Sequence, residues 1–332
     1  MKTDPTRLYW IDAIRSFACL CVITTHAPLV GLEQGYMVKS VYNYFSVAGA
    51  SILFFMISGA LVLYKPKPAV PFLKKRLSRI VFPMVFWSVI TLLVGVMYHD
   101  ISWKDFLHRV ICIPIGPQVG TYWFIYVIFG IYLVTPIFAT WLERCSKKDL
   151  ELYLIIWSIT LLLPYFEPMK VMVDFSHGYL YYFYGFLWFA VMGYYIRRYV
   201  NIPKFKWWHY AIILFLIVLP GLLYLTPIPH DMIQNRMALN VVALCVCYFV
   251  VLKHVHYSEK TKLVLYNFAQ HSFGIYLVHS LVIEKIIWPV MEIADLHYVI
   301  QVPLTTILAA AVSYLIVRLF SFLPYSKYLV GV

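Results

Sequence analysis

The sequence contains few charged residues, since Asp, Glu, Lys and Arg together make up 13% of its 332 residues. An ordinary soluble domain has about 25%, whereas 62% of this chain is apolar. The six cysteines lack CxxC or other metal-ligand spacing, and His254-x-His256 is the only close histidine pair. We therefore predict an integral membrane protein whose cysteines are reduced and which has no metal site.

Features of a cleaved signal peptide are also lacking. The N-terminal stretch "MKTDPTRLYW" includes an acidic residue, and the apolar run after it is about twenty residues long, which exceeds a signal-peptide core. We expect the first helix to stay in the mature protein. The fold class predicted is an all-α bundle of about ten transmembrane helices. The predicted spans are 10–30, 44–64, 79–98, 122–141, 152–166, 179–197, 208–226, 236–253, 271–290 and 299–323.

The net charge of +12 is distributed unevenly along the chain. With both termini in the cytoplasm, 21 of the 27 Lys and Arg residues fall in cytoplasmic segments. Such a bias orients membrane proteins, so the charge indicates inner-membrane topology rather than a nucleic-acid partner. The six Lys and Arg residues on the outer side are Lys39, Lys104, Arg109, Lys170, Arg236 and Lys285.

The connections between predicted spans are short, so residues 1–332 are expected to form a single domain without an appended soluble domain. The longest connection contains "SWKDFLHRVI", an amphipathic segment with a Ser-x-x-Asp start typical of a helix N-terminus. It is expected on the outer surface or folded back into the bundle. The first outer connection, "GLEQGYMVKS", offers Glu33 as its one acidic residue.

The first predicted span carries three ionisable residues. Arg15 and His26 are eleven positions apart, which is about 20° past three full helical turns and a rise of about 16 Å. They therefore share one helix face, and Asp12 is three residues before Arg15 and positioned to orient it. Because ionisable groups within membranes are costly, they indicate a functional site. Pro28 leaves the Thr24 carbonyl without a donor and opens the helix beside His26.

Two further patterns follow in "LFFMISGALVLYKPKPAVPFLKKRLSRIVFP". Ser58-Gly59 provides small residues for close helix packing. Arg76 and Arg79 lie one turn apart where the third span enters the membrane. Arg is suited to bidentate phosphate contacts, so the pair is interpreted either as orientation charge or as a site for a polyanionic ligand.

The chain resembles the acyltransferase-3 family of membrane acyltransferases over nearly its whole length. The resemblance rests on "IDAIRSFACLCVITTH", "FFMISGALV", "RLSRIVFP", "YWFIYVIFGIYLVTPI" and "HSFGIYLVHSLVIE". Within the family it is most similar to small stand-alone enzymes that O-acetylate bacterial surface polysaccharides. It implies that His26 is catalytic and that Arg15, Arg76 and Arg79 bind an acyl-CoA donor.

The resemblance also implies a cytoplasmic acyl-CoA, such as acetyl-CoA, as co-substrate and a cell-surface or lipid-linked glycan as acceptor. The remaining candidate site residues are Tyr122, Trp123, Tyr276 and His279. An unperturbed His pKa near 6.5 suits His26 to take the proton of an attacking sugar hydroxyl. Ser58 or His26 could instead carry the acyl group covalently. Acetyl and succinyl donors, and the oligomeric state, stay open.

A transporter or flippase of a lipid-linked saccharide is the main non-enzyme alternative. It would need polar residues on several helices, whereas the intramembrane ionisable residues concentrate on the first. A metal-dependent glycosyltransferase would be expected to have an acidic pair in the first outer connection, and Glu33 stands alone there. The partners predicted are therefore the lipid bilayer, acyl-CoA and a glycan.

Overall fold

The computed structural model describes residues 6–28, 32–166, 172–173, 178–226, 228–294 and 296–331. Every regular element within these ranges is helical. Lys170, one of the predicted outer cations, lies outside the described residues. The longer helices are α1 (Tyr9–His26), α2 (Leu32–Gly49), α3 (Ser51–Val62), α4 (Ala69–Met97), α5 (Trp103–Cys112), α6 (Trp123–Arg144), α7 (Lys147–Thr160), α8 (Leu187–Tyr199), α9 (Trp207–Tyr224), α11 (Leu239–His254), α12 (Glu259–Val282) and α14 (Tyr298–Phe320).

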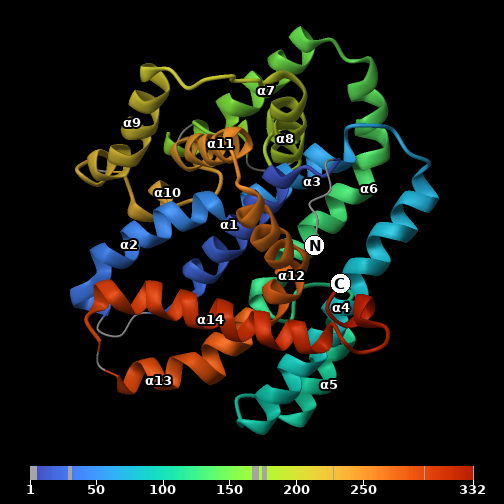
Figure 1. Ribbon diagram of the computed structural model, residues 1–332, viewed down its shortest axis with the longest axis vertical. Coiled ribbons are helices and arrows are strands. Elements are labelled where there is room, and N and C mark those ends of the chain that lie inside the picture. The colour runs from blue at the N-terminus through green and yellow to red at the C-terminus, as the bar shows by residue number, and fades with distance from the viewer. Residues whose placement is uncertain are drawn as a thin grey trace.

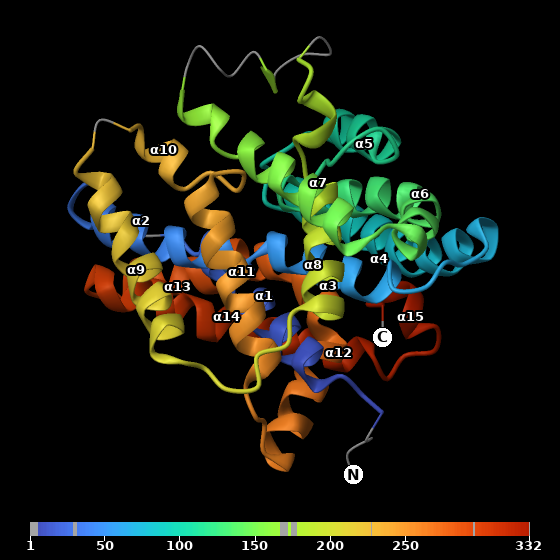
Figure 2. The same cartoon turned by 90° about the horizontal axis from the view of Figure 1, so that it is seen from above.

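Shorter elements connect these helices. They are the 3₁₀ turns η1 (Gly120–Tyr122), η2 (Leu163–Tyr165) and η4 (Tyr181–Phe183), the helices α10 (His230–Ile233), α13 (Trp288–Ile293) and α15 (Ser326–Leu329), and the π-helical turn η5 (Ile283–Ile287). Helix α1 lies in the middle of the bundle (Figures 1 and 2), where it contacts α2, α3, α11, α12 and α14. The helix with the candidate residues is therefore enclosed by protein.

Among the described residues, six helical segments are long and apolar enough to cross a membrane. They are Met37–Val62, Ala69–Met97, Gly120–Arg144, Trp207–Tyr224, Glu259–Ile293 and Val299–Phe320. The other four predicted spans correspond to α1, α7, α8 and α11. Helices α7, α8 and α11 have only 14, 13 and 16 residues, and α1 has the same 18 residues as α9 but is less apolar, since it includes Asp12 and Arg15. A 13-residue helix is about 20 Å long, less than the roughly 30 Å of a hydrocarbon core. Ten full-length spans are therefore not confirmed.

Three predicted helix starts were wrong in the same direction. The connection "GLEQGYMVKS" was expected to be an outer loop, but α2 begins at Leu32. No Gly or Pro interrupts residues 36–48, so the helix continues into the apolar run. Likewise α4 begins at Ala69 and α12 at Glu259, about ten residues before the predicted spans. Lys and Arg are good helix formers, so both basic segments are helical.

Helices α3 and α8 pack backbone to backbone through two glycines. A Cβ atom added at Gly59 would lie 1.8 Å from the carbonyl oxygen of Ala190, and one added at Gly193 would lie 1.9 Å from that of Met56. Only hydrogen in place of a side chain permits this approach. The prediction that Ser58-Gly59 serves close packing is thus confirmed for Gly59, and the contact sets the position of Ser58 beside it.

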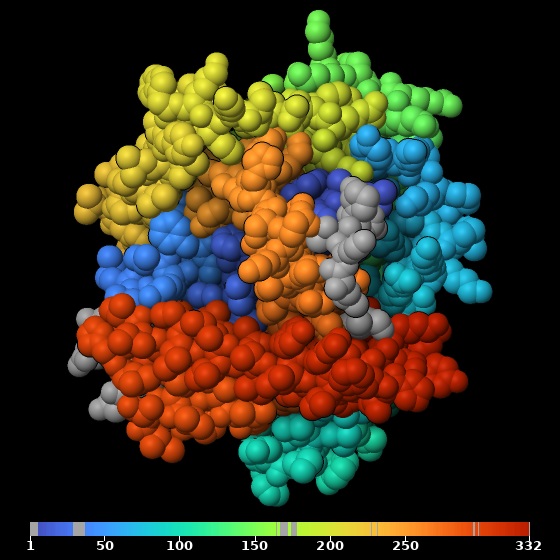
Figure 3. Space-filling view, in the orientation of Figure 1, coloured from blue at the N-terminus to red at the C-terminus, as the bar shows by residue number. Residues whose placement is uncertain are grey.

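Helix α5 lies on the surface. Ser102 and Asp105 form the predicted capping box, and none of the helix residues is buried. Its hydrogen bond to Ser102 lowers the pKa of the Asp105 carboxyl, which favours the charged capping form. Figure 3 shows α5 projecting beyond the edge formed by α14. Of the two expected placements, the surface is therefore correct, and the exposed side chains of Trp103 and Ile111 extend the apolar exterior.

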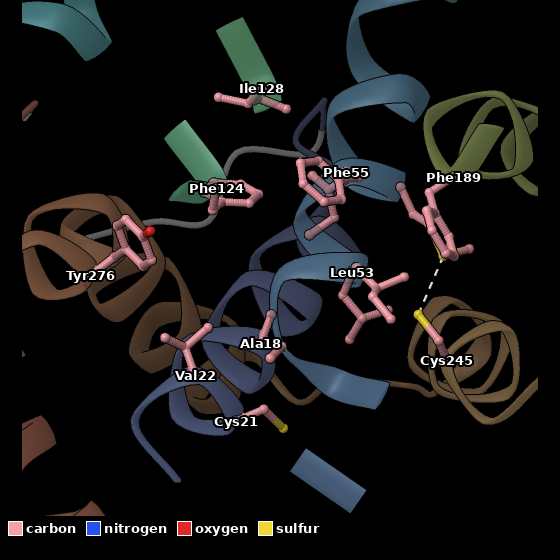
Figure 4. Close-up of a cluster of buried hydrophobic side chains, with 14 of the residues drawn as sticks. Ala18, Cys21, Val22, Leu53, Phe55, Phe124, Ile128, Phe189, Cys245 and Tyr276 are labelled. Carbon is pink, nitrogen blue, oxygen red and sulfur yellow. Dashed lines mark hydrogen bonds between the residues drawn. The ribbon is translucent and has the colours of Figure 1, made fainter. Parts of the chain in front are cut away.

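The core surrounds α1 and α3, and Figure 4 shows Phe55, Phe124 and Tyr276 converging on it from α3, α6 and α12. The rings of Phe124 and Tyr276 are 5.6 Å apart. Cys245 contacts the sulfur of Met56 at 3.5 Å. All six cysteines are free thiols, which confirms that they form no disulfide framework.

Candidate functional site

A cavity of about 220 Å³ opens beside the N-terminal half of α1. We call it the basic cavity because three of its lining residues are Arg15 from α1 and Arg76 and Arg79 from α4. Ser58 of α3 and Tyr276 of α12 also line it. Five residues singled out from the sequence therefore meet in one cavity, although they come from four different helices.

The charges in the basic cavity are not balanced. Its lining contains no Asp or Glu within the part of the chain that the structure describes, and Arg15 and Arg76 are close enough to repel each other. At its mouth, burial lowers the pKa of Lys67, and the neighbouring charges of Arg76 and Lys75 lower it further. Grouped cations with no acidic partner are suited to bind a polyanion.

Asp12 does not hold Arg15 as the sequence analysis expected. Its carboxylate accepts two hydrogen bonds from Arg7, at 2.7 Å to Nε and 2.9 Å to Nη2, and Asp12 is only 2% exposed. Arg7 precedes the helix, so it can fold back and use both carboxylate oxygens. Arg15 instead lines the basic cavity. Asp12 acts on Arg15 only through longer-range electrostatics, so the Arg15 charge remains available to a ligand.

His26 lines a second cavity, of about 270 Å³, at the other end of α1. We call it the histidine cavity; its other lining residues are Pro28, Ser280, Ile283, Glu284 and Trp288. Part of its wall is the π-helical turn η5, and such turns are frequent at functional sites. Arg15 and His26 therefore face separate cavities, about 16 Å apart along one helix.

Two residues of α12 lie between the cavities. Tyr276 lines the basic cavity, and its ring centroid is 5.7 Å from that of His279. The His279 ring in turn lies 5.3 Å from the His26 ring. We call Tyr276 and His279 the partition, because both are buried and their rings form a continuous chain of contacts from the basic cavity to His26.

Hydrogen bonds define the partition further. The Tyr276 hydroxyl donates to the carbonyl of Thr121, and the Tyr122 hydroxyl donates to the carbonyl of Leu277 at 2.6 Å. These bonds join η1 to α12, which indicates a structural role for Tyr122. His279 Nδ1 lies 2.5 Å from the Tyr276 carbonyl oxygen, so Nδ1 carries the proton. His279 Nε2 is then an acceptor, and it is buried without a hydrogen-bond partner among the described residues.

Helix α1 ends at His26, two residues before Pro28, but the Thr24 carbonyl is not left without a donor as predicted, because it accepts from the Ala27 amide at 3.3 Å. Lys39 of α2 adds a second donor at this helix end. The Lys39 ammonium donates to the Thr24 carbonyl at 3.3 Å and also to the Ala27 carbonyl. A cation is favourable at a helix C-terminus. Lys39 had been treated only as an outer-loop charge, and its role could not be read from its position in the sequence.

Trp123, the first residue of α6, lines neither cavity. The Arg236 guanidinium lies over its ring, with Cζ 4.9 Å from the ring centroid. In the sequence, Arg236 is one of only six cations predicted on the outer side. That scarcity of outer cations is the one sequence feature that could have marked it. Gly331, near the C-terminal end, lines the basic cavity, and no motif marked it.

The close sequence pair His254 and His256 does not form a site, and His254 has a structural role. His254 Nε2 accepts a hydrogen bond from the Ile202 amide at 3.0 Å, and Nδ1 donates to the Val250 carbonyl at 2.8 Å. His256 is exposed. Within the described ranges, no group of three His, Cys, Asp or Glu side chains could hold a metal ion.

The fold and site of the described residues define a class: a helical membrane protein with a group of cations at one end of a central helix, and the half-buried His26 beside the buried His279 at the other. The chain belongs to the acyltransferase-3 family, since a family model described as an acyltransferase domain matches residues 8–318. No curated protein and no solved structure matched the chain. Family membership favours a membrane acyltransferase over the transporter alternative.

Proposed function

We propose that the protein is an acyl-CoA-dependent O-acyltransferase of the inner membrane, folded as a single transmembrane domain. It moves an acyl group, acetyl by resemblance, from cytoplasmic acyl-CoA to a hydroxyl of a cell-surface or lipid-linked glycan. The observation that carries the proposal is the basic cavity, where Arg15, Arg76 and Arg79 converge without an acidic partner in its described lining.

The donor occupies the basic cavity in this proposal. CoA carries several phosphate charges, and guanidinium groups bind phosphate bidentately. A volume of about 220 Å³ is below the roughly 300–1,000 Å³ of drug-sized ligand pockets. The cavity therefore takes only part of the donor. Arg79 is exposed, so the rest of CoA extends past it into solvent.

The thioester reaches His26 by passing the partition, at Tyr276. The acceptor hydroxyl enters from the histidine cavity and attacks the thioester carbon. A C–O bond forms, the C–S bond breaks, and His26 takes the hydroxyl proton and returns it to the CoA thiolate. Ser58 lines the basic cavity rather than the histidine cavity, which supports direct transfer over a relay through Ser58.

His26→Ala tests the proposal in purified protein reconstituted in nanodiscs. We expect acyl transfer to a surrogate glycan to fall about 10²–10⁴-fold, the typical contribution of a general base, while CoA affinity stays unchanged. His26→Gln should be equally inactive, because Gln can hydrogen-bond but cannot take up the proton. The exposed His256→Ala is the matched control and should keep full activity. Near-normal transfer by His26→Ala would move the catalytic role to His279.

A further inference from the structure

Arg236 lies between α10 and α11 and carries a charge that no described acidic side chain neutralises. It is half-buried, with its guanidinium over the Trp123 ring. Its Nε is shielded from solvent and has no hydrogen-bond partner among the described residues. A buried charge is costly unless it is paired. The aromatic ring covers one face of the guanidinium and leaves the N–H donors at its edge unused.

The charge of Arg236 acts directly on the site. It interacts electrostatically with both His26 and Tyr276, although it lines neither the basic cavity nor the histidine cavity. Lys39 adds a second positive charge that acts on His26. Glu284, the acidic residue of the histidine cavity, is paired with Lys285 at 3.0 Å. The described surroundings of His26 therefore carry an excess of positive charge on the acceptor side.

We propose that Arg236 binds an acidic group of the acceptor, a carboxylate or a phosphate, and thereby selects an anionic glycan whose hydroxyl is presented to His26. The inference rests on the proposed function and names the acceptor class that it left open. The planar edge of a guanidinium matches either oxyanion with two parallel hydrogen bonds. The donor phosphates do not explain Arg236, because it does not line the basic cavity in which they are proposed to bind.

Three surrogate acceptors test the inference with protein in nanodiscs: octyl glucoside, which is neutral, octyl glucuronide, which carries a carboxylate, and glucosyl decyl phosphate, which carries a phosphodiester. Equilibrium binding and transfer from acetyl-CoA are measured for each. We expect one anionic acceptor to bind at least tenfold more tightly than the neutral one. Which anion is preferred distinguishes an acidic sugar from a phosphate-linked lipid.

Arg236→Gln should weaken binding of the preferred anion by about 10- to 100-fold, the loss of a charge-assisted hydrogen bond. The change should appear in KM more than in kcat, and Arg236→Lys should recover part of it. CoA affinity should not change. Arg109→Gln removes an exposed cation of α5 and is the matched control, which should keep the anion preference.

Three outcomes would overturn the inference. Equal binding of neutral and anionic acceptors by the unaltered protein would remove the selectivity that it requires. An equal loss of kcat for all three acceptors in Arg236→Gln, with the preference retained, would assign Arg236 to the transition state instead. Failure of the unaltered protein to bind CoA would overturn the proposed function itself, and the inference with it.

Discussion

Arg76→Ala should weaken CoA binding without destabilising the protein. Arg76 is half-buried in the basic cavity, where a charge-assisted hydrogen bond to phosphate contributes about 1.5–3 kcal/mol. Since 1.4 kcal/mol corresponds to a factor of ten, the Kd should rise by about 10- to 100-fold. Arg79 is exposed, so solvent screening should reduce its effect to the lower end of that range.

The protein without ligand should respond in the opposite direction. Arg15 and Arg76 repel each other across the cavity, so removal of one charge relieves that repulsion. The midpoint of thermal denaturation of Arg76→Ala should therefore equal or exceed that of the unaltered protein. CoA should raise this midpoint less in the variant, because stabilisation by a ligand depends on its affinity.

Isothermal titration of CoA into nanodiscs measures the effect, at two salt concentrations to separate screening from direct contact. Arg76→Lys should recover part of the affinity, since it keeps the charge but loses the bidentate geometry. Arg144→Ala removes an exposed cation in the last turn of α6, outside the basic cavity, and is the matched control. If Arg76→Ala and Arg79→Ala both bound CoA with unaltered affinity, these cations would serve only to orient the protein in the membrane.

Three other predictions concern the fold. Gly193→Ala should abolish folding or lower the denaturation midpoint sharply, because its Cβ would meet a backbone oxygen of α3 at 1.9 Å. Gly130→Ala has open space around its Cβ and should be neutral. Equal denaturation midpoints for the two variants would contradict the packing of α3 against α8. Lys39→Met should cost about 1–3 kcal/mol by leaving the Ala27 carbonyl at the end of α1 without its Lys39 donor, as chemical denaturation would show; an unaltered midpoint would refute the cap. An impermeant thiol reagent on intact cells should label Lys104→Cys but not Lys204→Cys, and the reverse would invert the proposed topology.

Helical character and the candidate residues were accessible from local sequence. The eleven-residue spacing of Arg15 and His26 depends only on helical geometry, and α1 has that geometry. Local patterns singled out Ser58 and Arg76, and the family resemblance added Tyr276; the structure gathers all three around one cavity with Arg15. Span lengths were less accessible, because apolar composition does not distinguish a membrane-crossing helix from a short helix such as α8 that is largely enclosed by protein.

Contacts between distant segments were decided only by the tertiary structure. Asp12 has a cation three residues away in its own helix, yet it pairs with Arg7, because the fold turns Arg15 into the basic cavity. Arg236 reaches Trp123, more than a hundred residues earlier in the chain, only because the fold brings the segment before α11 to the start of α6. Helical periodicity determines which side chains share a face of one helix, because the hydrogen bonds that set it are local. Which faces then meet depends on packing between helices, and that determined the two cavities and the partition between them.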